Sequence, residues 1–159
     1  MLNFSILKTQ MQSGFATHNN SANEAAGKIA SAFDAYIKTI ANQGNGTYAN
    51  MPGVSTLRST LTNIFNQQMA SKLAISNNIA AAINTCFLTL MTTYQTAPPQ
   101  PVGFDYLQTS LARTFGESQP SGQVFAQKFA GNIDGYVRKC MIKGVIPGTP
   151  PIVFDGPPK

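Results

Sequence analysis

The residues that could support catalysis or metal binding are few and widely spaced. The only histidine, His18, lies in the polar segment THNNS with no acidic residue nearby, and the only cysteines are Cys86 and Cys140. Neither cysteine belongs to a CxxC motif or to a mixed Cys/His motif. Histidine-based triads and multi-histidine metal sites need several such groups. We therefore expect neither within one chain, and we interpret His18 as a solvated turn residue.

The carboxylates are too dispersed to predict an acid/base pair. Asp34 and Asp134 each precede a basic residue by four positions, which is the spacing of surface ion pairs on a helix. Asp105 and Asp155 are interpreted as helix caps. No phosphate-binding glycine motif is present. These patterns predict a protein that is not an enzyme, with no cofactor and no small-molecule substrate.

The composition favours an assembly component. Only 11% of the 159 residues are charged, whereas about 25% is typical of soluble domains. Asn, Gln, Ser and Thr fill the polar positions and form a surface that repels other proteins weakly. The net charge is +5, but the basic residues are scattered, and only Arg138, Lys139 and Lys143 lie close together. Nucleic-acid binding, which normally clusters cations along one stripe, is therefore not expected.

An uncharged segment from Leu73 to Tyr94 raises the question of a membrane span. The segment contains several Asn and Thr residues, and no basic residue flanks its C-terminal side. A buried helix of a soluble domain is the better interpretation. The N-terminal sequence MLNFSILK has too short an apolar stretch for a signal peptide. No membrane association is expected.

One phrase of the sequence recurs at a fixed interval. KIASAFDAYIK starts at Lys28, NIAAAINTCFL at Asn78 and KFAGNIDGYVR at Lys128, so the period is 50 residues without gaps. Aligned leucines, phenylalanines and serines follow the same period. The sequence therefore predicts a single domain, 1–159, built of three repeats (1–50, 51–100 and 101–150) with an extended C-terminal tail, 144–159.

Each repeat contains the pattern of two helices. The first helix is expected after a cap at Ser5, Ser55 or Asp105, and the second after Ser21, Ser71 or Ser121. Ser21 and Glu24 form the spacing of a capping box. Gly- and Pro-rich connectors follow each second helix. The predicted fold class is all-α, with three tandem helical hairpins (six helices) joined by extended Gly/Pro-rich straps.

Differences between the copies predict how they pack. Apolar residues of the second helices recur at helical spacing, which places Cys86 and Cys140 in the core and Tyr36 and Tyr136 half-buried with their hydroxyls at the rim. The middle copy has Asn84 and Leu88 where the others have an acid and a base. We expect its second helix to be sandwiched, which favours a short linear stack, with a closed threefold ring as the alternative.

The segment from Ala30 to Lys38, which follows the motif A-x-A-Φ-D-x-Y-Φ-K, resembles one in small helical proteins of tailed bacteriophages. Ala130 to Arg138 follows the motif with substitutions. The resemblance implies a virion structural protein of the tail, baseplate or neck, assembled in the host cytoplasm. Its partners would be other virion proteins in a symmetric oligomer. The alternatives are a capsid-binding or decoration protein, and a helical-repeat adaptor that binds a host protein or peptide.

The straps are the segments expected to reach neighbouring chains, because proline-rich segments run extended along a surface. The candidate partner-contact residues are Tyr48, Pro98, Pro99, Pro101, Pro147, Pro150, Pro151 and Phe154.

Overall fold

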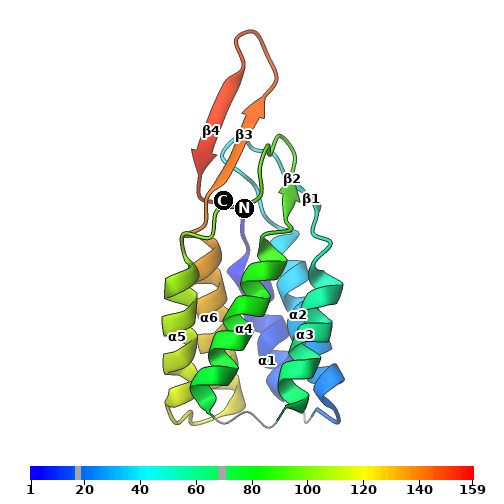
Figure 1. Ribbon diagram of the computed structural model, residues 1–159, viewed down its shortest axis with the longest axis vertical. Coiled ribbons are helices and arrows are strands. Elements are labelled where there is room, and N and C mark those ends of the chain that lie inside the picture. The colour runs from blue at the N-terminus through cyan, green and yellow to red at the C-terminus, as the bar shows by residue number, and fades with distance from the viewer. Residues whose placement is uncertain (17–18, 68–70) are drawn as a thin grey trace.

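A computed structural model describes residues 1–16, 19–67 and 71–159, and helices make up most of it (Figure 1). Three of them are α1 (Phe4–Ala16), α3 (Val54–Asn66) and α5 (Phe104–Gly116). The other three, each following one of these in the chain, are α2 (Ala22–Ile37), α4 (Lys72–Phe87) and α6 (Gly122–Val137). Helix bounds therefore recur every 50 residues, and the chain is mostly helical, as predicted. His18 lies outside the described residues.

The starts of α2, α4 and α6 follow the sequence prediction. The hydroxyls of Ser21, Ser71 and Ser121 accept hydrogen bonds from the backbone N–H three residues later, at 3.1, 3.1 and 3.2 Å. The Glu24 carboxylate reaches back to the N–H of Asn20 at 2.9 Å. The capping box thus closes one residue earlier than its usual form, in which the capping residue's own N–H is the donor.

The starts of α1, α3 and α5 differ from the prediction. These helices already include Ser5, Ser55 and Asp105, so the three residues are not N-caps. Gly53 and Gly103 occupy the N-cap positions of α3 and α5. The Gly53 N–H donates to Oγ1 of Thr89 at 2.9 Å, and a Cβ at Gly53 would lie only 2.7 Å from that oxygen. Close packing against the C-terminal end of α4, the following helix, therefore takes the place of a side-chain cap at α3.

The helices form a closed ring. Each helix packs against its sequence neighbours, and α1 also packs against α6. The preference for a linear stack was therefore wrong. Phe15 of α1 closes the ring by packing edge-on against Phe125 and Phe129 of α6, with ring centroids 5.3 and 6.2 Å apart.

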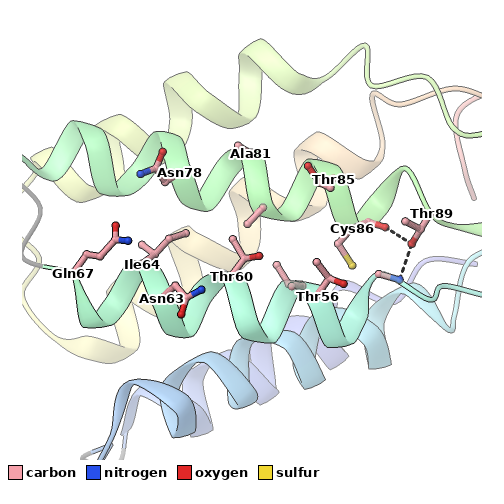
Figure 2. Close-up of a pocket in the computed structure, with 13 residues that line it drawn as sticks. Thr56, Thr60, Asn63, Ile64, Gln67, Asn78, Ala81, Thr85, Cys86 and Thr89 are labelled. Carbon is pink, nitrogen blue, oxygen red and sulfur yellow. Dashed lines mark hydrogen bonds between the residues drawn. The ribbon is translucent and has the colours of Figure 1, made fainter.

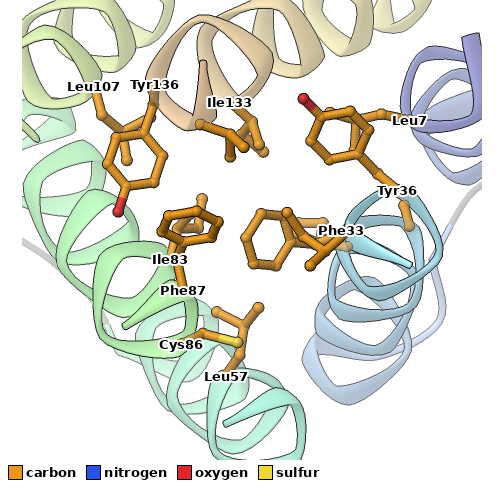
Figure 3. Packing of buried hydrophobic residues seen from close by; sticks show 14 of the residues in the cluster. Leu7, Phe33, Tyr36, Leu57, Ile83, Cys86, Phe87, Leu107, Ile133 and Tyr136 are labelled. Carbon is orange, nitrogen blue, oxygen red and sulfur yellow. The ribbon is translucent and has the colours of Figure 1, made fainter. Parts of the chain in front are cut away.

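The core lies along the centre of the ring, and α2, α4 and α6 supply most of it (Figure 3). Each of these three helices buries seven residues, whereas α1, α3 and α5 bury three or four. Phe33, Ile83 and Ile133 lie at equivalent positions and are fully buried. Cys86 and Cys140 are buried as predicted. Tyr36 and Tyr136 are completely buried, so the prediction of a half-buried ring was wrong.

Hydrogen bonds of the two tyrosines explain the substitutions in the middle copy. The Tyr36 hydroxyl donates to Oδ1 of Asp134 at 2.6 Å, and the Tyr136 hydroxyl donates to Oδ1 of Asn84 at 2.8 Å. Arg138 neutralises Asp134 at 2.8 Å, whereas Leu88 follows Asn84 and cannot neutralise a carboxylate there. A neutral amide is therefore the fitting acceptor at position 84. The sandwiched-helix expectation was wrong, because α4 has two packed neighbours, as α2 and α6 do.

Short strands shape the connectors, which adds to the all-α prediction. Strand β1 (Tyr48–Asn50) pairs antiparallel with β2 (Met91–Thr92). Strand β3 (Ile142–Ile146) pairs antiparallel with β4 (Ile152–Gly156), so the predicted tail forms a β-hairpin. Asp155 pairs with Lys143 across this hairpin at 3.1 Å and is not a helix cap.

Candidate partner interface

The connectors and both chain termini gather at one end of the ring, and the β3–β4 hairpin projects beyond them (Figure 1). We call this region, residues 1–3, 41–53, 88–103 and 141–159, the connector end. Asn42 joins two connectors: its Nδ2 donates to the Thr92 hydroxyl at 2.9 Å and to the Thr93 carbonyl at 2.7 Å, while its Oδ1 accepts from the Gly46 N–H. The connectors are thus parts of one hydrogen-bonded unit.

The hairpin is fixed to this unit along one side. The Val145 N–H donates to the carbonyl of Tyr94 at 2.9 Å, and the Thr96 N–H donates to the carbonyl of Lys143 at 3.1 Å. After β4, Lys159 and Ala41 exchange two backbone hydrogen bonds. These bonds hold the base of the hairpin, whereas the tip from Pro147 to Pro151 is exposed.

The predicted partner-contact residues all lie at the connector end, and they differ in exposure. The exposed ones are Pro98, Pro101, Pro147, Pro150 and Pro151. Tyr48 is half-buried and Pro99 is buried. Phe154 is 8% exposed and its ring packs over Gly44 and Gly144, so it holds the hairpin to the connectors and is not a free contact.

Sequence reasoning missed the most exposed apolar residues of this end. These side chains are between 42% and 90% exposed and belong to Met1, Met91, Tyr94, Val102, Ile152 and Val153. Among the described residues, the remaining large exposed hydrophobics are Leu73 and Tyr106. The run of three apolar residues after Pro151, of which only Phe154 is buried, was a signal for Ile152 and Val153. Nothing in the sequence marks Tyr94, whose backbone has a φ of 67°.

A second surface feature is a groove between α3 and α4 (Figure 2). Its volume is about 610 Å³, and its lining contains no charged residue. Leu57, Ile64 and Cys86 are buried at its floor, and the exposed residues Ala81 and Thr85 lie along its α4 side. We call this feature the α3–α4 groove.

The equivalent groove between α5 and α6 is filled differently. Tyr106 stands where α3 has Thr56, and Gly135 stands where α4 has Thr85. The Tyr106 phenol lies over Gly135, where a Cβ would be 2.6 Å from the phenol oxygen, and Lys139 Nζ lies 5.2 Å from the ring centroid. The remaining cavity is about 390 Å³, and its charged lining residues are Arg113, Glu117 and Lys128.

The equivalent region between α1 and α2 is nearly closed. The Lys28 side chain lies across it against Gly14, and the cavity is about 10 Å³. Asn78 is the shorter counterpart of Lys28 beside the α3–α4 groove. The α3–α4 groove is therefore open because small uncharged residues replace a ring and a long side chain.

The titratable core groups do not form a reactive site. Burial raises the pKa of Cys86 to about 12, with a smaller contribution from the charge of Asp34, and burial raises the pKa of Cys140 to about 11. Both thiols are therefore protonated at neutral pH and are poor nucleophiles. Burial also raises the pKa of Tyr36 and Tyr136 far above the ordinary value. Within residues 1–16, 19–67 and 71–159, no cluster of three or more potential ligands could hold a metal ion.

None of the described helices is both long enough and apolar enough to cross a membrane. Comparison with known protein families, with curated proteins and with solved structures finds no match to this chain.

Proposed function

We propose that this protein is a non-enzymatic structural component of a phage virion, in the tail, baseplate or neck. It binds neighbouring virion proteins through the connector end. The carrying observation is the concentration of exposed apolar side chains at this end, including Ile152 and Val153 at the start of β4 in the projecting hairpin. Exposed apolar groups that gather in one region are typical of protein-binding surfaces.

The backbone of Tyr94 supports the same proposal. A left-handed φ costs roughly 1–2 kcal/mol for a residue with a side chain. The Tyr94 side chain is nevertheless 42% exposed, so burial of its ring within the chain offsets little of this conformational cost. Strain of this kind is concentrated at functional sites. We infer that the Tyr94 ring is held outward to contact a partner.

The virion setting rests on the resemblance of the segment Ala30–Lys38 to phage proteins and on the low charge of the sequence. A low charge reduces the electrostatic repulsion between a protein and the neighbours it packs against in an assembly. The dispersed acids and the protonated core thiols support a structural role over a catalytic one.

We also infer that the six helices are three copies of one helical hairpin, in the repeats 1–50, 51–100 and 101–150. Recurrence of the helix bounds at 50-residue intervals supports this organisation. So do the three serine caps at positions 21, 71 and 121. Three similar hairpins in a ring present related surfaces in three directions.

The test combines detection in particles with matched surface variants. Purified particles are searched for the chain by mass spectrometry and imaging. Ile152→Asp with Val153→Asp should leave the circular dichroism spectrum unchanged and prevent incorporation, because charge replaces apolar contacts. Leu73→Asp, at a residue that is 57% exposed at the start of α4, is the control and should incorporate normally.

Two results would contradict the proposal. Absence of the chain from every particle would exclude a virion role. Normal incorporation of the Ile152/Val153 variant would exclude the start of β4 as a contact. Tyr94→Asn separates strain from binding: it should raise the melting temperature, because Asn tolerates a left-handed φ, and it should reduce incorporation.

A further inference from the structure

The outer face of α3 and α4 differs from the rest of the molecule in its charge. Residues 51–100 contain only two charged residues, Arg58 and Lys72. Arg58 turns away from this face, because its guanidinium lies 3.4 Å from a Cβ built at Gly27 of α2 and its Nε donates to Asn23 at 3.1 Å. Lys72 lies at the first position of α4, at the end of the ring opposite the connectors. The length of the α3–α4 groove therefore carries no charge.

The same face offers a ridge beside the groove. Ser55, Ser59 and Asn66 are exposed on α3 and Thr62 is partly exposed beside them, on the side of the helix that faces away from its buried residues. The hydroxyl of Ser59 donates to the carbonyl of Ser55 at 3.1 Å, and that of Thr62 donates to the carbonyl of Arg58 at 2.9 Å. Because these donors are already satisfied, covering them with protein costs little desolvation.

A ridge and a groove on one face make that face complementary to itself. Contacts between two copies related by a twofold axis use the same patch on both subunits. Small side chains in a ridge allow a helix to lie close in the groove of its partner. The chain carries a net charge of +5, so two copies repel each other wherever cations face cations. The uncharged face is where this repulsion is weakest.

We propose that the α3–α4 face binds a second copy of this chain, with the α3 ridge of each copy set into the α3–α4 groove of the other. The methyl groups of Ala81 and of the threonines that line the groove supply the apolar surface that is removed from water. This surface is separate from the connector end, so the proposal goes beyond the function above and does not depend on it.

The two equivalent faces, α1–α2 and α5–α6, lack the features that suit the α3–α4 face to contact with a second copy. Between α5 and α6, Tyr106 and charged residues occupy the corresponding space. Between α1 and α2, the Lys28 side chain lies across the corresponding space, and little cavity remains. The α3–α4 face is thus the one of the three that has both an open groove and no charge along its length.

Analytical ultracentrifugation of the full chain tests the proposal. The wild type should show a concentration-dependent dimer. Ala81→Glu should weaken dimerisation at least tenfold, because it places an unpaired carboxylate in the groove, and tenfold corresponds to about 1.4 kcal/mol. The matched control is Ser31→Glu, at the equivalent exposed position of α2, which should dimerise like the wild type.

A second variant guards against loss of folding. Thr56→Tyr with Thr85→Gly copies the α5–α6 residues and should fill the groove with the chain's own ring. We expect a folded monomer with a melting temperature near that of the wild type. A wild type that is monomeric at every concentration overturns the proposal, as does equal dimerisation of the Ala81→Glu variant. Equal weakening by Ser31→Glu would assign the contact elsewhere and also overturn it.

Hydrogen exchange locates the contact directly. Raising the protein concentration should increase the protection of the α3 and α4 amides in the wild type. The protection of the α5 and α6 amides should stay unchanged. The Ile152/Val153 variant should still dimerise, so failure of the connector-end proposal and failure of the dimer proposal give different results. Protection confined to the hairpin would contradict the α3–α4 contact.

Discussion

Two buried tyrosines and one cysteine occupy equivalent positions around the core. Figure 3 shows the three side chains, Tyr36, Cys86 and Tyr136. Tyr36 and Tyr136 each donate a hydrogen bond to an acceptor on another helix. At the third position Cys86 is too short to make such a bond, and its thiol lies at the floor of the α3–α4 groove. The absence of an aromatic ring at position 86 therefore contributes to the opening of the α3–α4 groove.

These buried groups predict that the protein loses stability in alkaline solution. The unfolded chain releases thiol protons near an ordinary pKa of about 8.5. The folded chain holds them to about 12 at Cys86 and about 11 at Cys140, and the two tyrosine pKa values are also raised. The contribution of each thiol to the free energy of unfolding is complete below the pKa of the unfolded chain. This contribution is lost as the pH rises toward and through the pKa of the thiol in the folded chain. Each thiol contributes a loss of about 1.4 kcal/mol per pH unit in this window.

Urea unfolding at increasing pH measures this effect. The Cys86→Ala/Cys140→Ala variant should show a shallower decline, because the tyrosines alone remain. A free energy of unfolding that is constant from about pH 8 to about pH 11 would show that the thiols are not protected from ionisation.

The residue types predicted some roles and not others. The serine caps and the Asp34–Lys38 and Asp134–Arg138 pairs follow from spacing within one helix, and they are confirmed, with ion-pair distances of 2.6 and 2.8 Å. The tyrosine hydrogen bonds could not be predicted in this way. Their acceptors lie 98 and 52 residues away along the chain, and only the closed fold brings them together.

At the scale of elements, local sequence determines the helices, whereas pairing between distant segments determines the structure of the connectors. Helices follow from local periodicity, and their existence and order were predicted. Strands β1 to β4 pair across the connectors, so their formation depends on partners far apart in sequence. The sequence of the tail contains prolines at both ends of β4, which favoured an extended strap over a hairpin.

Gly144 is expected to control the docking of the hairpin. A Cβ at this position would overlap the carbonyl oxygen of Tyr94 and the ring of Phe154. Gly144→Ala should therefore detach the hairpin and lower the free energy of unfolding by about 1–3 kcal/mol, with little change in helical content. Hydrogen exchange of β3 and β4 is the direct measurement.

The control for this substitution is Gly131→Ala in α6. A Cβ at Gly131 meets no atom within 4 Å, so the change should stabilise the helix by up to about 1 kcal/mol. Unchanged protection of the hairpin in the Gly144 variant would show that the close approach at this glycine is not needed for docking.

At the scale of the whole molecule, closure of the ring decides how stability is shared. In a linear array each unit contacts only its neighbours, and removal of an end unit leaves the rest folded. Here α1 packs on α6 through Phe15, so removal of α5 and α6 uncovers both α1 and α4. The closure could not be read from the sequence, because aromatic residues at 15, 125 and 129 also fit the interior of an open stack.

A chain that ends at residue 103 tests this difference. We expect it to lose cooperative thermal unfolding and most of its helical signal, because the aromatic contacts of α1 are gone. A circular permutant that joins Lys159 to Met1 and opens within 117–121 keeps every helix and should fold. If the truncated chain retained four stable helices, α1 to α4, the ring would not be required for folding.

Both termini lie among the connectors, and this arrangement matters for anyone who labels the protein (Figure 1). An affinity tag or fluorescent protein fused to Met1 or Lys159 would sit at the connector end, near the hairpin, and would obstruct the surface it is meant to report on. The turn from Glu117 to Pro120 lies at the opposite end of the ring, between α5 and α6, and its residues are exposed except Gln119. A short epitope inserted there would mark the molecule and leave the connector end uncovered.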